Sequence, residues 1–272
     1  MADLDADNRS ISELFEAALA GDYDDEEPRE AVRELRHRSN PETEVLKVAL
    51  GYCHSGNPKT RSRGLDVLAQ LGAGKPDSER PWIEECVSVA IAALQDENSQ
   101  VVHSAAWALA HLGGPRSVLA LIKIKQHSDP GVRWAVAYGM RSDRNEDSKL
   151  TLVELMEDPD DEVRDWATFG LGDLWRIGDS FELEDSPEIR AALRKRLADS
   201  YAPARDEALW GLAKRKEPFA LRELRRRLES DGSVSGDEMA ANELLNPNGG
   251  ESTIEELQSG LRRLIDELPN SP

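Results

Sequence analysis

The chain has 272 residues, of which 39% are hydrophobic and 32% are charged. Its 53 acidic residues outnumber its 34 basic ones, and the formal net charge of -19 argues against a nucleic-acid binder, which must neutralise phosphates. The longest apolar stretch, Cys86 to Leu94, is too short to span a bilayer, and two cysteines are too few for a disulfide framework, so we expect a cytoplasmic protein.

The first 55 residues predict helices separated by short polar breaks. Apolar residues at helical spacing favour helices from Ile11 to Ala20, Pro28 to Arg38 and Glu42 to Cys53. Residues 1–30 carry 11 acids and two bases, and the stretch from Asp22 to Glu27 is typical of an exposed acidic loop. We therefore predict an N-terminal helical cap over residues 1–55, with an acidic surface that serves solubility.

An internal repeat follows over residues 56–231. Each copy starts at an anchor residue and has apolar or small residues three, four and seven positions later. The anchors are Arg61, Val102, Arg133, Arg164 and Arg205. Their spacings of 41, 31, 31 and 41 residues indicate a 31-residue unit with two insertions. One insertion is the Gly/Pro stretch at residues 72–77, and the other is the acidic stretch at residues 176–185.

Each repeat predicts two helices. The first contains the anchor and begins after a turn signal such as Asp158-Pro159. The second follows a polar break, and we expect it at residues 115–127, 147–157, 187–198 and 218–229. Neither helix can bury its apolar face alone, so the pairs must stack on their neighbours. No segment shows the period-two alternation of β-strands. The predicted fold is all-α: a right-handed α-α superhelical solenoid of about five repeats with helical caps, monomeric or weakly dimeric.

Residues 232–272 predict a C-terminal helical cap. Asn246 to Gly250 has the composition of a turn. A closing helix is expected from Ser252 to Leu268, with Ser252 and Glu255 forming a capping box at its start.

The segment from Asp158 to Gly172 resembles the HEAT repeat, in the short bacterial form also seen in phycobilisome-lyase-type HEAT-like proteins. The resemblance covers about residues 57 to 231. In that family, an acid before the first helix and an Arg inside it form a ladder between successive repeats. The resemblance implies that the ladder residues here are Asp129, Asp158, Asp199, Arg133, Arg164 and Arg205. The copy at Val102 lacks the Arg. Such repeats host many unrelated tasks, so the motif specifies fold and not function.

Aromatic residues recur at one repeat position, five residues past the anchor. The five copies place Asp66, Trp107, Tyr138, Phe169 and Trp210 there. Neighbouring copies predict a column, which either packs between repeats, the interpretation we favour, or forms a semi-exposed strip that anchors a partner. The presence of Asp66 at this position favours an exposed edge, because burying a carboxylate in a dry groove is costly. Three further tryptophans fall outside the column and are assigned to core or edge packing; they are Trp134, Trp166 and Trp175.

Charge is unevenly distributed within the repeats. Residues 141–185 carry five bases and 15 acids, whereas residues 186–229 carry 12 bases and seven acids. The basic residues of second helices include Arg190, Arg194, Arg222, Arg225 and Arg226. The HEAT resemblance implies that second helices line the concave surface. The basic stretch is therefore either compensation for the acidic insertion or a binding site for an acidic peptide or anion.

No pattern in the sequence indicates catalysis. The five histidines are too dispersed for a motif such as H-E-x-x-H, and neither a phosphate-binding loop nor a G-x-S-x-G elbow is present. We therefore predict no catalytic residues, no cofactor, no metal and no membrane contact. The predicted function is a non-enzymatic scaffold or adaptor that binds another protein on a curved surface. Two alternatives remain open: an immunity-type inhibitor that masks a basic toxin, and a subunit of a HEAT-like bilin lyase.

Overall fold

The computed structural model describes residues 8–22, 25–38, 44–71, 80–142, 145–172 and 184–231, together with residues 253, 256–257, 259–260 and 262–263. Every regular element within these ranges is a helix, so the predicted all-α class is confirmed. The chain divides into two compact units, residues 1–143 and residues 144–272. None of the helices described is long and apolar enough to cross a membrane.

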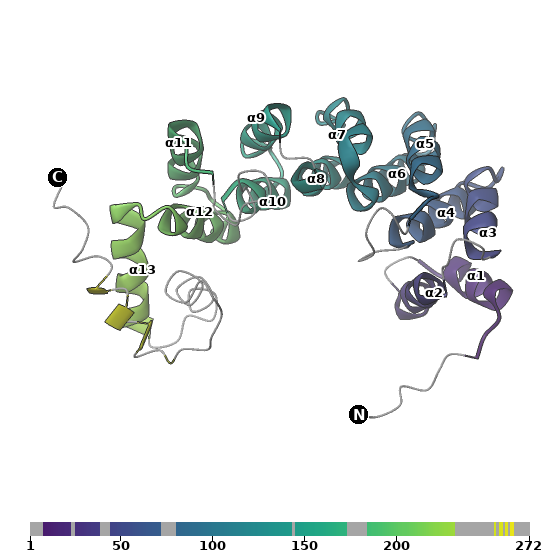
Figure 1. Cartoon of the computed structure of the whole chain (residues 1–272), viewed down its shortest axis with the longest axis horizontal. Helices are drawn as coiled ribbons and strands as arrows, with labels where there is room; N and C mark the ends of the chain where they lie inside the picture. Colours follow the sequence, from purple (N-terminus) through teal and green to yellow (C-terminus); the bar gives the residue numbers. More distant parts are fainter. Residues whose placement is uncertain are drawn as a thin grey trace. The chain divides into compact units, whose positions relative to one another are not determined.

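The N-terminal unit is built from helices that pack in two rows. Its elements are α1 (Ile11–Leu19), α2 (Glu26–His37), α3 (Glu44–Cys53), α4 (Pro58–Gln70), α5 (Ile83–Ala93), α6 (Ser99–Leu112), α7 (Gly114–Ile122), α8 (Pro130–Gly139) and the 3-10 turn η2 (Met140–Ser142). Helices α4, α6 and α8 lie side by side in one row, and α5 and α7 form a second row against them (Figure 1). The row of α4, α6 and α8 carries the anchor residues of the first three repeats.

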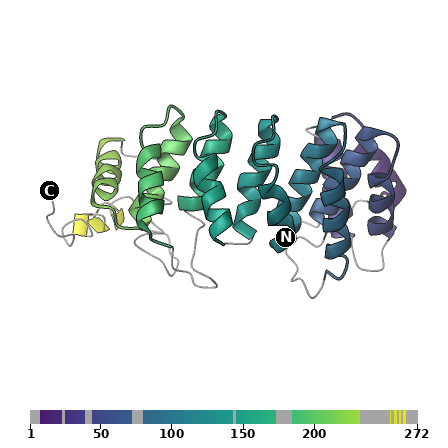
Figure 2. The same ribbon diagram turned by 90° about the horizontal axis from the view of Figure 1, so that it is seen from above.

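The C-terminal unit repeats this arrangement with fewer helices. Its elements are α9 (Glu146–Leu155), α10 (Asp161–Gly172), α11 (Pro187–Arg196), α12 (Ala202–Lys214) and α13 (Pro218–Asp231). Helices α10 and α12 pack side by side, with α9 and α11 against them, and α13 packs on α12 (Figure 2). The successive helices of this unit therefore form a stack.

Small residues allow α10 and α12 to approach closely. A Cβ atom placed on Gly211 would lie 2.7 Å from the Cα atom of Gly172, so α12 does not tolerate a side chain at Gly211 without a shift of the helices. The residues three, four and seven positions past the anchor Arg164 are all fully buried; they are Ala167, Thr168 and Leu171. The repeat pattern thus marks the face of each helix that enters the core.

Polar side chains fix where the anchor-bearing helices begin. The Asn57 side chain accepts hydrogen bonds from the backbone N–H groups of Lys59 and Thr60, and Pro58 occupies the first turn of α4. Asn98 caps α6 in the same way. Helix α2 begins at Glu26, so two of the acids predicted to lie in a loop are in a first helical turn, where the helix dipole favours carboxylates.

The helix pairs differ from the predicted grouping. Each anchor-bearing helix packs more closely on the helix before it than on the helix after it: α3 pairs with α4, α5 with α6, and α9 with α10. Only residues 54–57 separate α3 from α4, whereas the predicted insertions follow α4 and α10. Residues 72–77 and most of residues 176–185 lie outside the described residues.

The C-terminal cap is described at a few positions only. The turn at residues 246–250, Ser252 and Glu255 lie outside the described residues. The Thr253 N–H donates to Glu256 Oε2 at 2.8 Å, and the Glu256 N–H donates to Thr253 Oγ1 at 3.3 Å. The capping box therefore involves Thr253 and Glu256, one residue later than predicted, because these two side chains reach each other's backbone.

Candidate functional site

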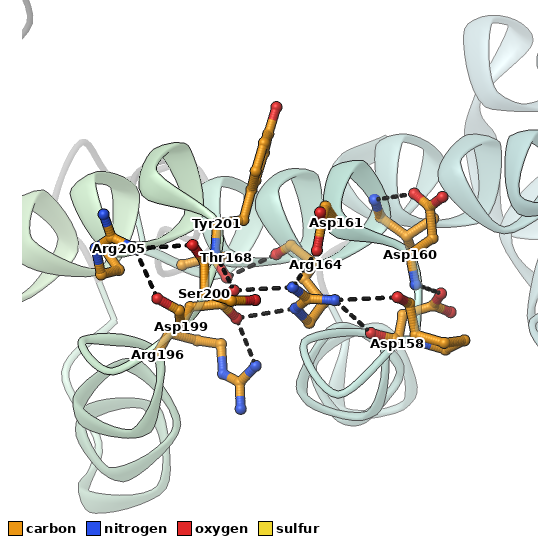
Figure 3. Close-up of polar contacts among 12 residues, drawn as sticks. Asp158, Asp160, Asp161, Arg164, Thr168, Arg196, Asp199, Ser200, Tyr201 and Arg205 are labelled. Atoms are coloured by element: carbon orange, nitrogen blue, oxygen red, sulfur yellow. Dashed lines mark hydrogen bonds and ion pairs between the residues drawn. The ribbon is translucent and has the colours of Figure 1, made fainter.

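A buried ionic network joins α10 to the turn before α12 (Figure 3). The Arg164 Nε and Nη2 atoms donate to the two oxygens of Asp199 at 2.9 and 2.8 Å. Asp199 also accepts from Arg196 at 2.8 Å and from the Tyr201 N–H at 2.9 Å. Its side chain is 2% exposed, so this carboxylate is buried among four donors. The network holds successive helix pairs of the C-terminal unit together.

The donors keep Asp199 ionised despite its burial. The hydrogen bond from Arg164 is the largest influence and lowers the pKa of Asp199 to about 2, whereas burial acts in the opposite direction. The remaining Arg164 N–H groups donate to the Asp158 carbonyl and to the Asp161 carboxylate. The Arg164 guanidinium thus binds groups of its own unit, and the network connects α10 to the turn before α12. We call this network of Arg164, Arg196, Asp199 and Tyr201 the structural joint.

The other ladder residues inferred from the resemblance make hydrogen bonds in the turns that precede the anchor-bearing helices. Arg133 and Arg205 each donate to two backbone carbonyls in the turn before their own helix. Asp129 and Asp158 each accept a hydrogen bond from the backbone N–H two residues later. These contacts order the turn that precedes each anchor-bearing helix.

The sequence analysis missed one ladder pair. Arg61 on α4 donates to both oxygens of Asp96 at 2.8 Å, and Asp96 precedes α6. The two residues are 35 positions apart, the same separation as Arg164 and Asp199. Asp96 occupies the turn position of Asp199, so transferring the acid position to the Val102 copy would have found it.

Aromatic side chains of α6 and α8 stack into one aromatic cluster. We define this cluster as Trp107, His111, Trp134, Tyr138 and Arg141. The Trp134 ring lies 5.2 Å from Trp107 and 5.3 Å from Tyr138, centroid to centroid, in stacked orientations. His111 stacks on Tyr138 at 4.9 Å, and the Arg141 guanidinium lies 3.5 Å from the Tyr138 centroid. All five residues are half-buried, so each of them is partly exposed to solvent.

Trp134 belongs to this cluster although the sequence analysis placed it outside the aromatic column. Residues four apart lie on the same face of a helix, so Trp134 accompanies Tyr138. In the C-terminal unit, Phe169 contacts Trp166 edge-on at 5.6 Å, and Trp210 is half-buried on α12. The repeat position therefore identifies half-buried aromatics, and helical neighbours add to them.

Asp66 is buried, contrary to the expectation of an exposed edge. The residue is 6% exposed, and its carboxylate accepts from Arg63 Nη1, one helical turn away, at 3.1 Å. Burial is the largest influence and raises the pKa of Asp66 to about 6, although Arg63 and a hydrogen bond from Ser104 lower it. A local Arg thus makes a carboxylate tolerable where the sequence analysis expected solvent.

Arg63 and Asp66 line a pocket in the N-terminal unit. Its volume is about 830 Å³. The lining comes from α4 between Asn57 and Asp66, from α6 between Asn98 and Trp107, and from Asp22. Trp107 therefore borders this pocket and belongs to the aromatic cluster as well.

The C-terminal unit has an acidic face on α10 and α12, formed by Asp165, Asp206 and Glu207. Burial and repulsion from neighbouring carboxylates raise the pKa of Asp165 to about 6 and that of Glu207 to about 7. One oxygen of each of these two side chains is buried without a hydrogen-bond partner among the described residues. The unit thus holds carboxylates that a cationic group would stabilise.

The basic residues of the second helices lie on α11 and α13. Arg190 pairs with Asp185 and with Glu217 at 2.6 Å, and Arg194 pairs with Glu217 at 3.1 Å. Arg226 pairs with Glu223 on its own helix, Arg222 is exposed, and the Arg225 side chain lies outside the described part of the chain. Arg190 and Arg194 of α11 therefore form ion pairs with carboxylates of the same unit. They do not share helices with Phe169 and Trp210.

Comparisons with known proteins identify the repeat. The sequence matches the family of HEAT repeats over residues 87–172 and 150–245, which together cover more than half of the chain. No curated protein sequence matches the chain. YibA of Escherichia coli is 20% identical and aligns over 97% of this chain and 94% of its own length, with a TM-score of 0.67.

Two further solved structures share the arrangement of helices. The archaeal HEAT-like repeats protein from Thermococcus onnurineus NA1 is 15% identical, with a TM-score of 0.51 over 94% of this chain and 98% of that chain. A chain of the S. pombe condensin Cnd3-Cnd2 subcomplex is 16% identical, with a TM-score of 0.58 over 94% of this chain and 37% of that chain. At these identities the likeness concerns the fold.

Proposed function

The chain belongs to the HEAT-repeat family, and on that premise we propose that it is a non-enzymatic scaffold that binds another protein through the aromatic cluster of α6 and α8. Stacked repeats build extended surfaces, and binding is the common use of such surfaces. We also propose a cytoplasmic location, which the two free, buried cysteines support.

The aromatic cluster is the observation that carries the proposal. Rings combine large contact area with few rotatable bonds, so they dominate the affinity of protein interfaces. Trp107, Trp134 and Tyr138 hold one another in place by stacking, so little conformational entropy is lost on binding. Arg141, seated over Tyr138, adds a type of side chain that is enriched at interface hot spots.

The charge of the chain favours a basic partner. The formal net charge is -19, and a field of that sign accelerates association with positively charged proteins. The acidic face of α10 and α12 offers carboxylates whose pKa values are raised, and a cationic group would relieve their repulsion. This face also favours the second candidate, an immunity-type inhibitor that masks a basic toxin.

Affinity capture tests the proposal. The immobilised protein is exposed to a lysate of its native cell, the retained protein is identified by mass spectrometry, and its Kd is measured by calorimetry. Trp134→Ala should weaken binding by about 2 kcal/mol or more, roughly 30-fold, because it removes the central ring of the cluster. Phe219→Ala is the matched control, since Phe219 is an exposed aromatic residue of α13 that lies outside the cluster.

Two results would contradict the proposal. One is an equal Kd for the wild type and the folded Trp134→Ala variant, which would remove the cluster from the interface. The other is a Phe219→Ala loss as large as the Trp134→Ala loss. Identification of a basic toxin as the captured protein would select the immunity-type function.

A further inference from the structure

The acidic face lies where α10 and α12 pack directly on each other. Asp165 and Asp206 occupy the same repeat position, one residue past the anchors of their helices. The Glu207 carbonyl oxygen lies 3.4 Å from the position of a Cβ atom placed on Gly172, so this part of α12 is in contact with α10. The three acidic side chains of the face therefore come from two adjacent helices.

Asp165 and Glu207 have carboxylates as their charged neighbours. Asp206 repels both of them, and Asp165 is also repelled by Glu162 and Asp199. Within the described part of the chain, neither Asp165 nor Glu207 makes a hydrogen bond or an ion pair. A cation placed at this face would offset the repulsion and favour the ionised form of both groups.

One oxygen of each carboxyl group is accessible to a ligand. Asp165 Oδ1 and Glu207 Oε2 are buried, so a ligand does not contact them. Both residues are half-buried, and their second oxygens, Asp165 Oδ2 and Glu207 Oε1, are neither buried in this way nor hydrogen-bonded to a described residue. A donor can therefore bind each group at its second oxygen. The positive charge of that donor also stabilises the buried oxygen, because Coulomb attraction does not require contact.

Aromatic residues flank the acidic face on both helices. Phe169 follows Asp165 by four residues on α10, and this spacing places the ring and the acid on one side of the helix. Trp210 follows Asp206 by four residues on α12 in the same way. Both aromatic residues are half-buried, and Trp166 contacts Phe169 edge-on at 5.6 Å. Ring faces attract cations, so the rings and the acids favour the same kind of ligand.

The equivalent positions of the N-terminal unit carry two rings. Trp134 and Tyr138 of α8 lie one and five residues past their anchor, which are the repeat positions of Asp165 and Phe169. All four residues are half-buried, so this side of the anchor-bearing helices is partly exposed in both units. Replacing the first ring by a carboxylate keeps an exposed binding position and changes its preference from apolar groups to cations.

We infer that the acidic face, together with Phe169 and Trp210, binds the arginine side chains of an extended basic segment of a partner protein. A guanidinium donates hydrogen bonds to a carboxylate and stacks on a ring with its flat face, which an ammonium group does not do. Packed helices lie about 8–10 Å apart, and alternate side chains of an extended chain are about 7 Å apart on one side. An Arg-x-Arg segment therefore reaches Asp165 with one side chain and Glu207 with the other.

The inference goes beyond the scaffold function and does not rest on it, because the acidic face and the aromatic cluster belong to different units. An NMR titration of the isotope-labelled full chain tests it. The probe is the peptide acetyl-Gly-Arg-Gly-Arg-Gly-amide. A second peptide has lysine in place of both arginines, which keeps the charge and removes the flat group. A third has citrulline, which keeps the shape of arginine and removes the charge.

The expected result is a saturable shift of backbone signals in α10 and α12 with the arginine peptide. The lysine peptide should bind about threefold or more weakly, and the citrulline peptide should not bind. The Kd of the arginine peptide should fall as the pH rises from about 5 to about 8, because the pKa values of Asp165 and Glu207 are raised to about 6 and about 7 and only the ionised groups attract the peptide.

Asp165→Asn should raise the Kd of the arginine peptide about 10-fold or more, because it removes a partly buried charge from the contact. The variant should remain folded, since the change relieves repulsion. Trp210→Leu should weaken binding of the arginine peptide more than that of the lysine peptide. Asp147→Asn is the matched control: Asp147 is an exposed acid of α9, so its replacement changes the net charge equally but outside the acidic face. It should leave the Kd unchanged, and so should Trp134→Ala, which separates this inference from the scaffold proposal.

Several outcomes would overturn the inference. An equal rise of the Kd in Asp147→Asn and Asp165→Asn would show that net charge alone attracts the peptide. Equal affinity for the arginine and lysine peptides would remove the rings from the contact, and a Kd independent of pH would remove Asp165 and Glu207 from it. Self-association of the wild type that is lost in Asp165→Asn would identify a second copy of this chain as the occupant of the face.

Discussion

Asp199 in the C-terminal unit and Asp66 in the N-terminal unit are both buried carboxylates that accept from an arginine, yet their pKa values move in opposite directions. Two arginines and a backbone N–H donate to Asp199, and its pKa falls to about 2. Asp66 receives one Arg63 contact and the Ser104 hydroxyl, and its pKa rises to about 6. Donors outweigh burial in the first case, and burial outweighs donors in the second.

The comparison distinguishes Asp199, a carboxylate that stays ionised in the structural joint, from Asp66, a carboxylate whose protonation can change. Asp199 remains charged across the physiological range, so the contact that it makes between helix pairs is permanent. The raised pKa of Asp66 brings its titration close to the physiological range, so its charge is more sensitive to pH than that of Asp199. Burial alone therefore does not indicate the role of a carboxylate, because the donors around it shift its pKa in the opposite direction.

Removing the joint should have the largest effect. Asp199→Ala leaves Arg164 and Arg196 as buried cations without their shared carboxylate, and we expect the free energy of unfolding to fall by about 3–5 kcal/mol. Hydrogen exchange should locate the loss in α10, α11 and α12, since repeat units transmit damage mainly to neighbours. Asp185→Ala is the control: its exposed pair with Arg190 should contribute less than about 1 kcal/mol. Equal losses in the two variants would end the distinction.

The pH dependence of stability should differ in sign between the two carboxylates. The lowered pKa of Asp199 contributes stability that is complete above the unfolded value of about 3.9 and is lost as the pH falls toward 2. The raised pKa of Asp66 contributes stability that is complete below about 3.9 and is lost as the pH rises through about 6.

Urea titrations between pH 2 and about 7 measure both terms, because the slope of stability against pH counts protons. Asp199→Asn should remove the acid-side loss, and Asp66→Asn should remove the loss between about pH 4 and 6. An unchanged profile in Asp66→Asn would show that Asp66 titrates as an ordinary exposed carboxylate.

The pair of Arg61 and Asp96 tests an intermediate case. Its two side chains are 16% and 14% exposed, and the sequence separation equals that of the joint in the C-terminal unit. We expect Asp96→Ala to lower the free energy of unfolding by less than Asp199→Ala does, because water reaches the arginine that is left. A loss as large as that of Asp199→Ala would show that position in the repeat outweighs burial.

The smallest change removes one donor from Asp66. Ser104→Ala deletes a buried hydroxyl that hydrogen-bonds the carboxylate, and we expect a loss of about 1 kcal/mol above the pKa of Asp66. The loss should shrink below that pKa, where the carboxyl is protonated. Thermal melts at two pH values on either side of 6 measure the difference, and a loss that is independent of pH would contradict it.

The sequence predicts the fold well because the repeat pattern is a packing pattern. Residues such as Ala167 and Leu171 recur at core positions, and their spacing alone identifies the buried face. The pair of Arg164 and Asp199 follows from the family resemblance. Asp96 was not predicted, because its copy of the repeat has Val102 in place of the anchor arginine.

The site is harder to read because it depends on neighbours that a repeat alignment does not compare. Trp134 joins the aromatic cluster through a residue four positions away on its own helix, outside the column that the repeats define. Asp66 has its arginine three positions earlier, which is visible in the sequence, but the burial that raises its pKa is a property of the assembled helices. The repeat register identifies equivalent positions in successive repeats, and the packing of the helices determines the role of the residue at each position.

The reactivity of the two cysteines can report on the opening of the N-terminal unit. Cys53 on α3 and Cys86 on α5 are free and buried, and burial raises the pKa of each thiol to about 12. Alkylating reagents attack the thiolate, so both residues stay inert while the helices remain packed. Labelling then proceeds only through transient separation of these helices, and its rate measures the opening equilibrium of the unit. The labelling rate of the natural cysteines thus measures, without any engineered probe, how often the N-terminal repeats open.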